Sequence, residues 1–107
     1  SAIDVAKAIA VLATNGGNIQ EYEGVDKIKL PLPPQVMVAT TAGSGSEVSQ
    51  FSIITDSEKK KKLTIISKSL VPDIAIVDPQ TLTTKSPHLT ATTGLDVLTH
   101  AIESFVS

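Results

Sequence analysis

The first sixteen residues carry apolar side chains at spacings of three or four, which predicts an amphipathic helix. Gly16 and Gly17 follow this segment and are typical of the end of a helix. The apolar positions of the pattern are Ile3, Ala6, Ile9 or Ala10, and Ala13.

Four later stretches are short and rich in β-branched residues, which predicts strands. Residues 36–40 (VMVAT) and 74–78 (IAIVD) are continuous apolar runs and indicate buried strands. Residues 51–55 and 62–67 flank the polar segment DSEKKK, so we interpret them as a hairpin with the lysine run at its tip.

The last segment predicts one long helix from Leu89 onward, preceded by Ser86 as N-cap and Pro87 at the first helical position. On a helical wheel its apolar residues form one stripe, which we expect to be the core face. That stripe consists of Leu95, Leu98, Ile102 and Phe105. A second stripe, more than a quarter-turn away, consists of Asp96, His100 and Glu103.

Strands that alternate with helices predict an α/β domain. Both ends of the chain stop inside helical patterns, so we expect a piece of a larger protein. The net charge of −2 gives no reason to expect nucleic acid as a partner, and no apolar run approaches the length of a membrane span. The absence of cysteine excludes disulfides and thiolate metal sites, and it fits a cytoplasmic protein.

The glycine-rich segment VATTAGSGSEV follows a predicted strand and offers hydroxyls and accessible amide groups, which can cradle a phosphate. It matches neither the dinucleotide motif G-x-G-x-x-G, nor a P-loop, nor a nucleophile elbow. Ser44 and Glu47 match a capping box, which predicts a short helix starting near Gly45. By its pattern alone, a solvated loop remains the alternative.

Asp96 and His100 are four residues apart and share a face of the predicted helix. A carboxylate and an imidazole on adjacent turns can ligate one divalent cation, and this donor set suits Fe(II) or Zn(II). The alternative is a solvated pair of little energetic importance. The lysine run, residues 59–62, also allows two interpretations. Its charges serve only to keep the hairpin tip soluble, or one lysine belongs to a functional site, in which case Lys62 is favoured because it lies nearest the sheet.

Several motifs in order closely resemble the iron-containing (group III) alcohol dehydrogenases from about residue 31 to residue 107. They are TTAGSGSEV, ITD with a following lysine, PDIAIVDP and TGLDVLTHAIESFVS. The opening SAIDVAK is similar to the tail of that family's phosphate-binding turn, GGGS-x-x-D-x-AK. The resemblance implies a Rossmann-like (dehydroquinate synthase-like) nucleotide-binding portion with a β-hairpin over residues 1–84. Residues 85–107 would then begin an all-α metal-binding domain.

The resemblance also implies a site. The residues expected to bind NAD or NADP are Ser1, Asp4, Thr40, Thr41, Ser44 and Lys62. The expected metal ligands are Asp96 and His100, for Fe(II) or alternatively Zn(II), with two further histidine ligands of the family falling beyond Ser107.

The implied function is metal-dependent, NAD(P)-linked interconversion of a primary alcohol or diol and its aldehyde or ketone, by a homo-oligomer when full length. Without the remaining ligands and the first mononucleotide half, we expect the 107 residues alone to be inactive. The alternatives are a sister polyol dehydrogenase, a maleylacetate reductase, or a non-catalytic nucleotide- or phosphate-binding module.

Overall fold

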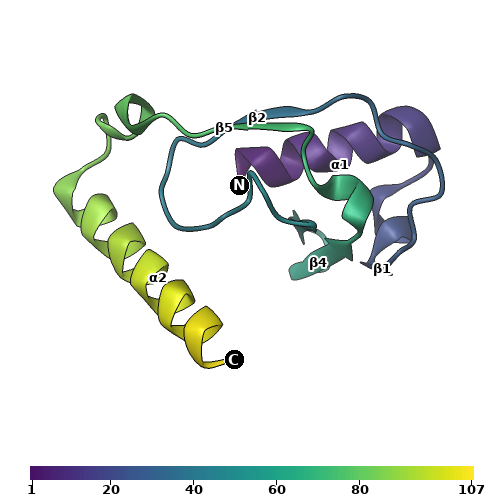
Figure 1. The fold of residues 1–107 in the computed structure, drawn as a ribbon. Coiled ribbons are helices and arrows are strands. Elements are labelled where there is room, and N and C mark those ends of the chain that lie inside the picture. Colours follow the sequence, from purple (N-terminus) through teal and green to yellow (C-terminus); the bar gives the residue numbers. More distant parts are fainter.

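The computed structural model describes all residues from 1 to 107. The predicted α/β class is observed, with helices at both ends of the chain and five strands between them (Figure 1). In chain order the elements are α1 (Ala2–Asn15), η1 (Ile19–Tyr22), β1 (Gly24–Val25), β2 (Val36–Val38), β3 (Phe51–Asp56), β4 (Lys61–Ile66), η2 (Lys68–Leu70), β5 (Ile74–Ile76), η3 (Pro79–Leu82) and α2 (Pro87–Val106).

The strands form two small sheets. In the first, the order is β1-β4-β3, with β1 parallel and β3 antiparallel to β4. The β3–β4 pair is the predicted hairpin, and Asp56 caps its tip by accepting hydrogen bonds from the amides of Glu58 and Lys59 at 3.0 and 3.1 Å. In the second sheet, β2 and β5 are parallel and pair Val36 with Ile74.

The core lies where α1 meets the first sheet. Val11, Tyr22, Ile65 and Leu70 form its buried cluster. Tyr22 satisfies its buried hydroxyl by donating a hydrogen bond to the carbonyl oxygen of Gly16 at 2.6 Å. The face of α1 that packs inward therefore includes Val11. The helical spacing also offered Ile9 as a candidate apolar position, but this residue is 62% exposed.

The expectation that residues 36–40 and 74–78 form buried strands is wrong for this chain. Only Met37 and Ala39 are buried in the first segment, while Ile74 and Ile76 of β5 are 55% and 44% exposed. Parallel strands are normally covered on both faces, which accounts for their continuous apolar sequence. In this chain of 107 residues, much of the surface of β2 and β5 remains open.

α2 begins as predicted, because Ser86 accepts a hydrogen bond from the amide of Leu89 at 3.2 Å and Pro87 occupies the first turn. It projects away from the rest of the chain and carries the C-terminus at its far end (Figure 1). Neither helix combines the length and the hydropathy needed to cross a membrane.

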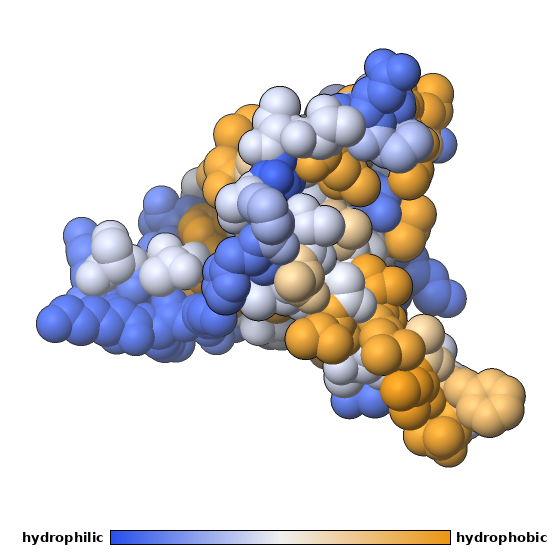
Figure 2. Space-filling view, turned by 90° about the vertical axis from the view of Figure 1, so that its left-hand side faces the viewer, coloured by the Kyte–Doolittle hydropathy of each residue, from blue (hydrophilic) through white to orange (hydrophobic).

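The apolar stripe of α2 is not a core face in this chain, contrary to the prediction. Leu95 is 64% exposed, Phe105 is 89% exposed, and no residue of the helix is buried. Figure 2 shows the resulting hydrophobic surface along the arm that projects at the lower right. Periodicity identified the amphipathic face correctly, but it carries no information on which segment covers that face.

Candidate functional site

The glycine-rich segment between β2 and β3 lies beside the start of α1 and forms a cavity with it. The cavity has a volume of about 330 Å³ and is open to solvent. Four of the residues expected to bind a cofactor line it together: Ser1, Thr40, Thr41 and Ser44. The predicted short helix near Gly45 is not formed. The chain instead makes one turn there, closed by a hydrogen bond from the amide of Val48 to the carbonyl oxygen of Gly45 at 3.1 Å.

The N-terminus of α1 opens beside this cavity. Ser1 is the N-cap, and its hydroxyl accepts a hydrogen bond from the amide of Asp4 at 3.3 Å. Helix N-termini carry a partial positive charge and unpaired amides, so they favour anions such as phosphate. The cavity therefore combines a helix N-terminus with several hydroxyls, which is the chemistry expected of a phosphate site.

Asp4 is not in the cavity wall. Its carboxylate accepts hydrogen bonds from the hydroxyls of Ser1 at 2.6 Å and Ser46 at 3.3 Å, and its carbonyl accepts one from Ser52 at 2.8 Å. Burial by itself would raise the pKa of Asp4, but the hydrogen bond from Ser1 and the adjacent terminal ammonium of this chain lower it below 3.8. Asp4 is therefore ionised, and its hydrogen bonds join α1 to the glycine-rich segment and to β3.

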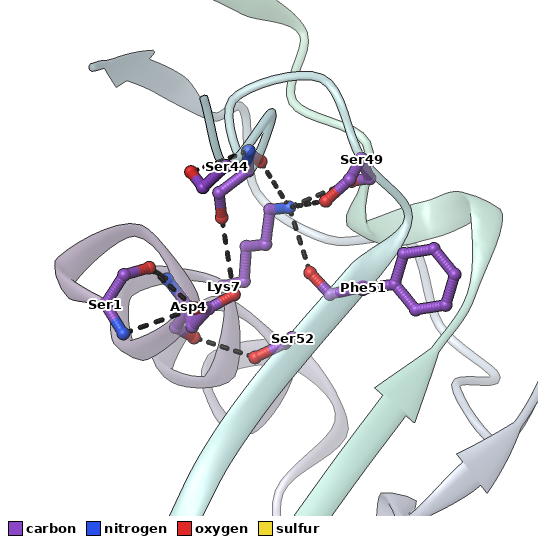
Figure 3. A network of polar contacts seen from close by, with 8 residues as sticks. Ser1, Asp4, Lys7, Ser44, Ser49, Phe51 and Ser52 are labelled. Carbon is purple, nitrogen blue, oxygen red and sulfur yellow. Dashed lines mark hydrogen bonds and ion pairs between the residues drawn. The ribbon is translucent and has the colours of Figure 1, made fainter. Parts of the chain in front are cut away.

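Lys7 is a fully buried lysine that sequence reasoning did not single out. Its ammonium donates to the carbonyl oxygens of Ser46, Ser49 and Phe51 at 2.7, 2.8 and 3.0 Å (Figure 3). Burial lowers its pKa below 10.5, although the charges of Asp4 and Glu47 act in the opposite direction. The helical pattern gave no sign of this burial, and the one signal available in the sequence was that Lys7 ends the SAIDVAK segment, which resembles the tail of a phosphate-binding turn.

The other end of the glycine-rich segment meets α2. Nδ1 of His100 lies 2.9 Å from the carbonyl oxygen of Gly43, and a side chain at Gly43 would come within 2.8 Å of the carbonyl oxygen of Thr93. Nε2 of His100 lies 3.6 Å from Oδ1 of Asp96, and both side chains are about half exposed. The structure thus places the expected metal-ligand pair beside the same segment that lines the cavity.

The sequence of this chain matches those of known proteins. The family model for iron-containing alcohol dehydrogenase matches residues 1–79. The chain belongs to the iron-containing alcohol dehydrogenase family. It is 50% identical over all its 107 residues to alcohol dehydrogenase 4 of Schizosaccharomyces pombe, and 46% identical to the NAD-dependent methanol dehydrogenase of Bacillus methanolicus. It spans only 25% and 28% of the length of these relatives, so it corresponds to about a quarter of each.

Solved structures of similar sequence share the fold. A 1,3-propanediol oxidoreductase superposes with a TM-score of 0.91 at 42% identity, over 95% of this chain and 27% of its own. The sulfoacetaldehyde reductase of Bifidobacterium kashiwanohense, solved in complex with NAD⁺, superposes with a TM-score of 0.84 at 40% identity, over 97% of this chain and 28% of its own. The predicted family and fold are therefore confirmed. The domain boundary at residues 84 and 85 stays a prediction.

Asp96 and His100 of α2 are suited to serve as two ligands of a divalent cation. A carbonyl oxygen only accepts hydrogen bonds, so the contact with Gly43 requires a proton on Nδ1 of His100. In the neutral imidazole, Nε2 is then the unprotonated nitrogen, and it lies on the side of Asp96. The chain holds no cluster of three or more histidine, cysteine or acidic side chains that could bind a metal. Asp96 and His100 can therefore supply part of a metal site but not a closed one.

Lys62 is not brought together with the other predicted site residues. It pairs with Thr55 near the exposed end of the hairpin and does not line the cavity. The neighbouring Lys61 reaches Glu23, with Nζ 3.5 Å from a carboxylate oxygen. A role for Lys62 at the cofactor stays a prediction.

Proposed function

We propose that these residues are the part of a metal-dependent, NAD(P)-linked alcohol dehydrogenase in which the cofactor site and the metal site meet. One observation carries the proposal: the segment from Thr40 to Ser44 lines the cavity at α1 and also contacts His100 through Gly43. Hydride transfer requires the carbinol carbon and the nicotinamide to be held side by side. A single short segment that borders both sites meets that requirement.

The cavity side would bind the phosphates of NAD or NADP. Thr40, Thr41 and Ser44 supply hydroxyls, and Ser1 marks the positive end of α1. The volume of about 330 Å³ suits a portion of a dinucleotide, which agrees with a chain that spans a quarter of its relatives. Asp4 would act within the protein, by holding Ser1 and Ser46 in place.

On the α2 side, Asp96 and His100 would hold Fe(II), with Zn(II) as the alternative, together with ligands from elsewhere in the protein. Such a cation supplies a Lewis acid that polarises the alcohol oxygen. The contribution of this chain is to orient the imidazole through Gly43 and to keep its Nε2 available. The family relatives named for methanol and 1,3-propanediol support a primary alcohol or a diol as substrate.

The test is an assay of a full-length protein that carries these residues. NAD- and NADP-linked oxidation of short alcohols and diols is measured after metal removal and after restoration of Fe(II) or Zn(II). We expect oxidation that disappears with the metal and returns with it. Binding of a dinucleotide without metal-dependent oxidation would contradict the proposal and favour a nucleotide-binding module. Reduction of maleylacetate, without alcohol oxidation, would instead identify the sister enzyme.

A further inference from the structure

The most unusual side chain outside the proposed ligands is Lys7. Lysine is rarely fully buried unless its charge is paired, because removing an ammonium from water is costly. Here the side chain has no exposed surface, and its hydrogen bonds go to carbonyl oxygens of one segment, at Ser46, Ser49 and Phe51. A further contact reaches the hydroxyl of Ser49 at 3.3 Å.

These bonds fix the direction in which the backbone of the turn points. Ser46 lines the cavity, but Lys7 does not, so the carbonyl oxygen of Ser46 that Lys7 binds at 2.7 Å is drawn toward the core. A carbonyl oxygen that faced the cavity would repel a phosphate. Figure 3 shows Lys7 extending from α1 into the centre of this turn, with the bound carbonyl groups converging on its ammonium.

Lys7 also sets the charge beneath the cavity. Glu47 lines the cavity wall, and the carboxylate of Asp4 accepts a hydrogen bond from Ser46, another residue of that wall. The negative charges of both acidic groups favour the charged form of Lys7 and raise its pKa against the effect of burial. Without that ammonium, the carboxylate of Glu47 in the cavity wall and that of Asp4 behind the wall would have no buried cation to offset their charge on a phosphate ligand.

We infer that Lys7 is a positioning residue for the cofactor: it holds the carbonyl oxygen of Ser46 away from the cavity and balances the carboxylates of Asp4 and Glu47, so that the cavity accepts the phosphates of a dinucleotide. This inference rests on the function proposed above. It predicts a selective effect, because Lys7 anchors the part of the segment after Ser44, whereas α2 and the metal-ligand pair contact the part at Gly43.

The experiment uses a full-length protein with Lys7→Met, Lys7→Arg and, as control, Lys59→Met. Methionine keeps much of the length of lysine without its charge, and Lys59 is an exposed lysine at the hairpin tip. Dissociation constants for NADH and NADPH are measured directly by fluorescence, and Michaelis constants are measured for cofactor and alcohol. Thermal unfolding identifies the variants that fold.

For Lys7→Met we expect cofactor binding weakened about tenfold or more, since charged hydrogen bonds and a charge balance are lost, with the Michaelis constant for alcohol within about twofold of wild type. Lys7→Arg keeps the charge, but its planar guanidinium cannot bond the carbonyls in the same geometry. Its affinity for the cofactor should therefore lie between those of wild type and Lys7→Met. If Lys7→Met does not fold, Lys7→Arg alone tests the inference. Its cofactor binding should weaken while its Michaelis constant for alcohol stays near that of wild type. Lys59→Met is expected to match wild type.

Two results would overturn the inference. One is cofactor binding unchanged in a folded Lys7 variant, and the other is an equal rise of both Michaelis constants, which indicates only general structural damage. A wild-type protein that binds neither NADH nor NADPH would overturn the proposed function itself and this inference with it. The direct binding measurement separates that case from the first two.

Discussion

Nδ1 of His100 lies 2.9 Å from the carbonyl oxygen of Gly43, although 57 positions separate the two residues in sequence. The contact joins α2 to the glycine-rich segment and orients the imidazole so that Nε2 is on the side of Asp96. Hydrogen bonds of this kind fix the tautomer and the ring orientation of metal-ligating histidines. The geometry of the proposed metal site therefore depends on a backbone group of the segment that lines the proposed cofactor cavity.

Gly43 is expected to tolerate no side chain. Its φ is 103°, and an added Cβ would lie 2.8 Å from the carbonyl oxygen of Thr93 and 3.0 Å from Cγ2 of Val97. Backbone strain and collision together predict that Gly43→Ala destabilises the protein by about 1–3 kcal/mol and displaces α2, with loss of bound metal. Denaturant unfolding and metal analysis of the full-length protein measure both effects.

Gly45→Ala is the matched control for this change. Gly45 also has a positive φ, of 65°, but a Cβ there meets no atom within 4 Å. We expect some loss of stability from the left-handed backbone and no loss of metal. Equal loss of metal from both variants would show that the contact between Gly43 and α2 is unimportant.

Asp96→Asn and His100→Ala each remove one proposed ligand. Metal affinity is expected to fall by at least about tenfold, because mutating even the partners of metal ligands lowers affinity by that much. Alcohol oxidation is expected to fall with it. The control is Glu103→Gln, an exposed acidic residue on the same helix. Metal content determined at controlled free metal concentration is the measurement. Retention of full metal content by both ligand variants would refute the assignment.

Thr40→Val removes one hydroxyl from the cavity wall and keeps the shape of the side chain. If that hydroxyl bonds the cofactor, NAD(P)H affinity is expected to fall about three- to tenfold, which corresponds to the loss of one hydrogen bond. Thr55→Val, at an exposed position of β3, serves as the control. Titration of NAD(P)H with both variants tests this expectation, and identical dissociation constants would place the cofactor elsewhere.

The buried ammonium of Lys7 predicts an alkaline pH dependence of stability. Burial lowers its pKa below 10.5, so between the folded-state pKa and 10.5 the unfolded chain holds a proton that the folded chain has released. The free energy of unfolding therefore rises with pH across that window, and this contribution is absent at lower pH. The difference in unfolding free energy between wild type and Lys7→Met should grow as pH approaches 10.5. A constant or shrinking difference would contradict it.

Much of the local structure could be predicted from the sequence, because it is determined by neighbouring residues. The cap at Ser86 and Pro87 and the hairpin around DSEKKK depend on a few adjacent positions, and both are observed. The family resemblance further selected Ser1, Thr40, Thr41 and Ser44, which the structure gathers around one cavity.

What could not be predicted depends on contacts distant in sequence. The stripe that includes Leu95 and Phe105 was correctly recognised as apolar, but its burial depends on what lies over it. Ser44 and Glu47 fit a capping pattern, yet the chain makes only one turn there, closed at Val48, and Lys7, which is distant in sequence, binds the carbonyl oxygen of Ser46. A lysine in a helical pattern is expected on the surface, so the pattern concealed the role of Lys7.

The central claim is that the glycine-rich segment borders both the cofactor site and the metal site at Asp96 and His100, so that the nicotinamide lies beside the metal. Nuclear relaxation of bound NAD⁺ in a full-length protein loaded with a paramagnetic divalent cation, Mn²⁺ or Co²⁺, tests this directly. The account predicts that the nicotinamide protons relax much faster than the adenine protons, and that the enhancement disappears in Asp96→Asn. Equal relaxation of both rings, or stronger relaxation of the adenine, would contradict it.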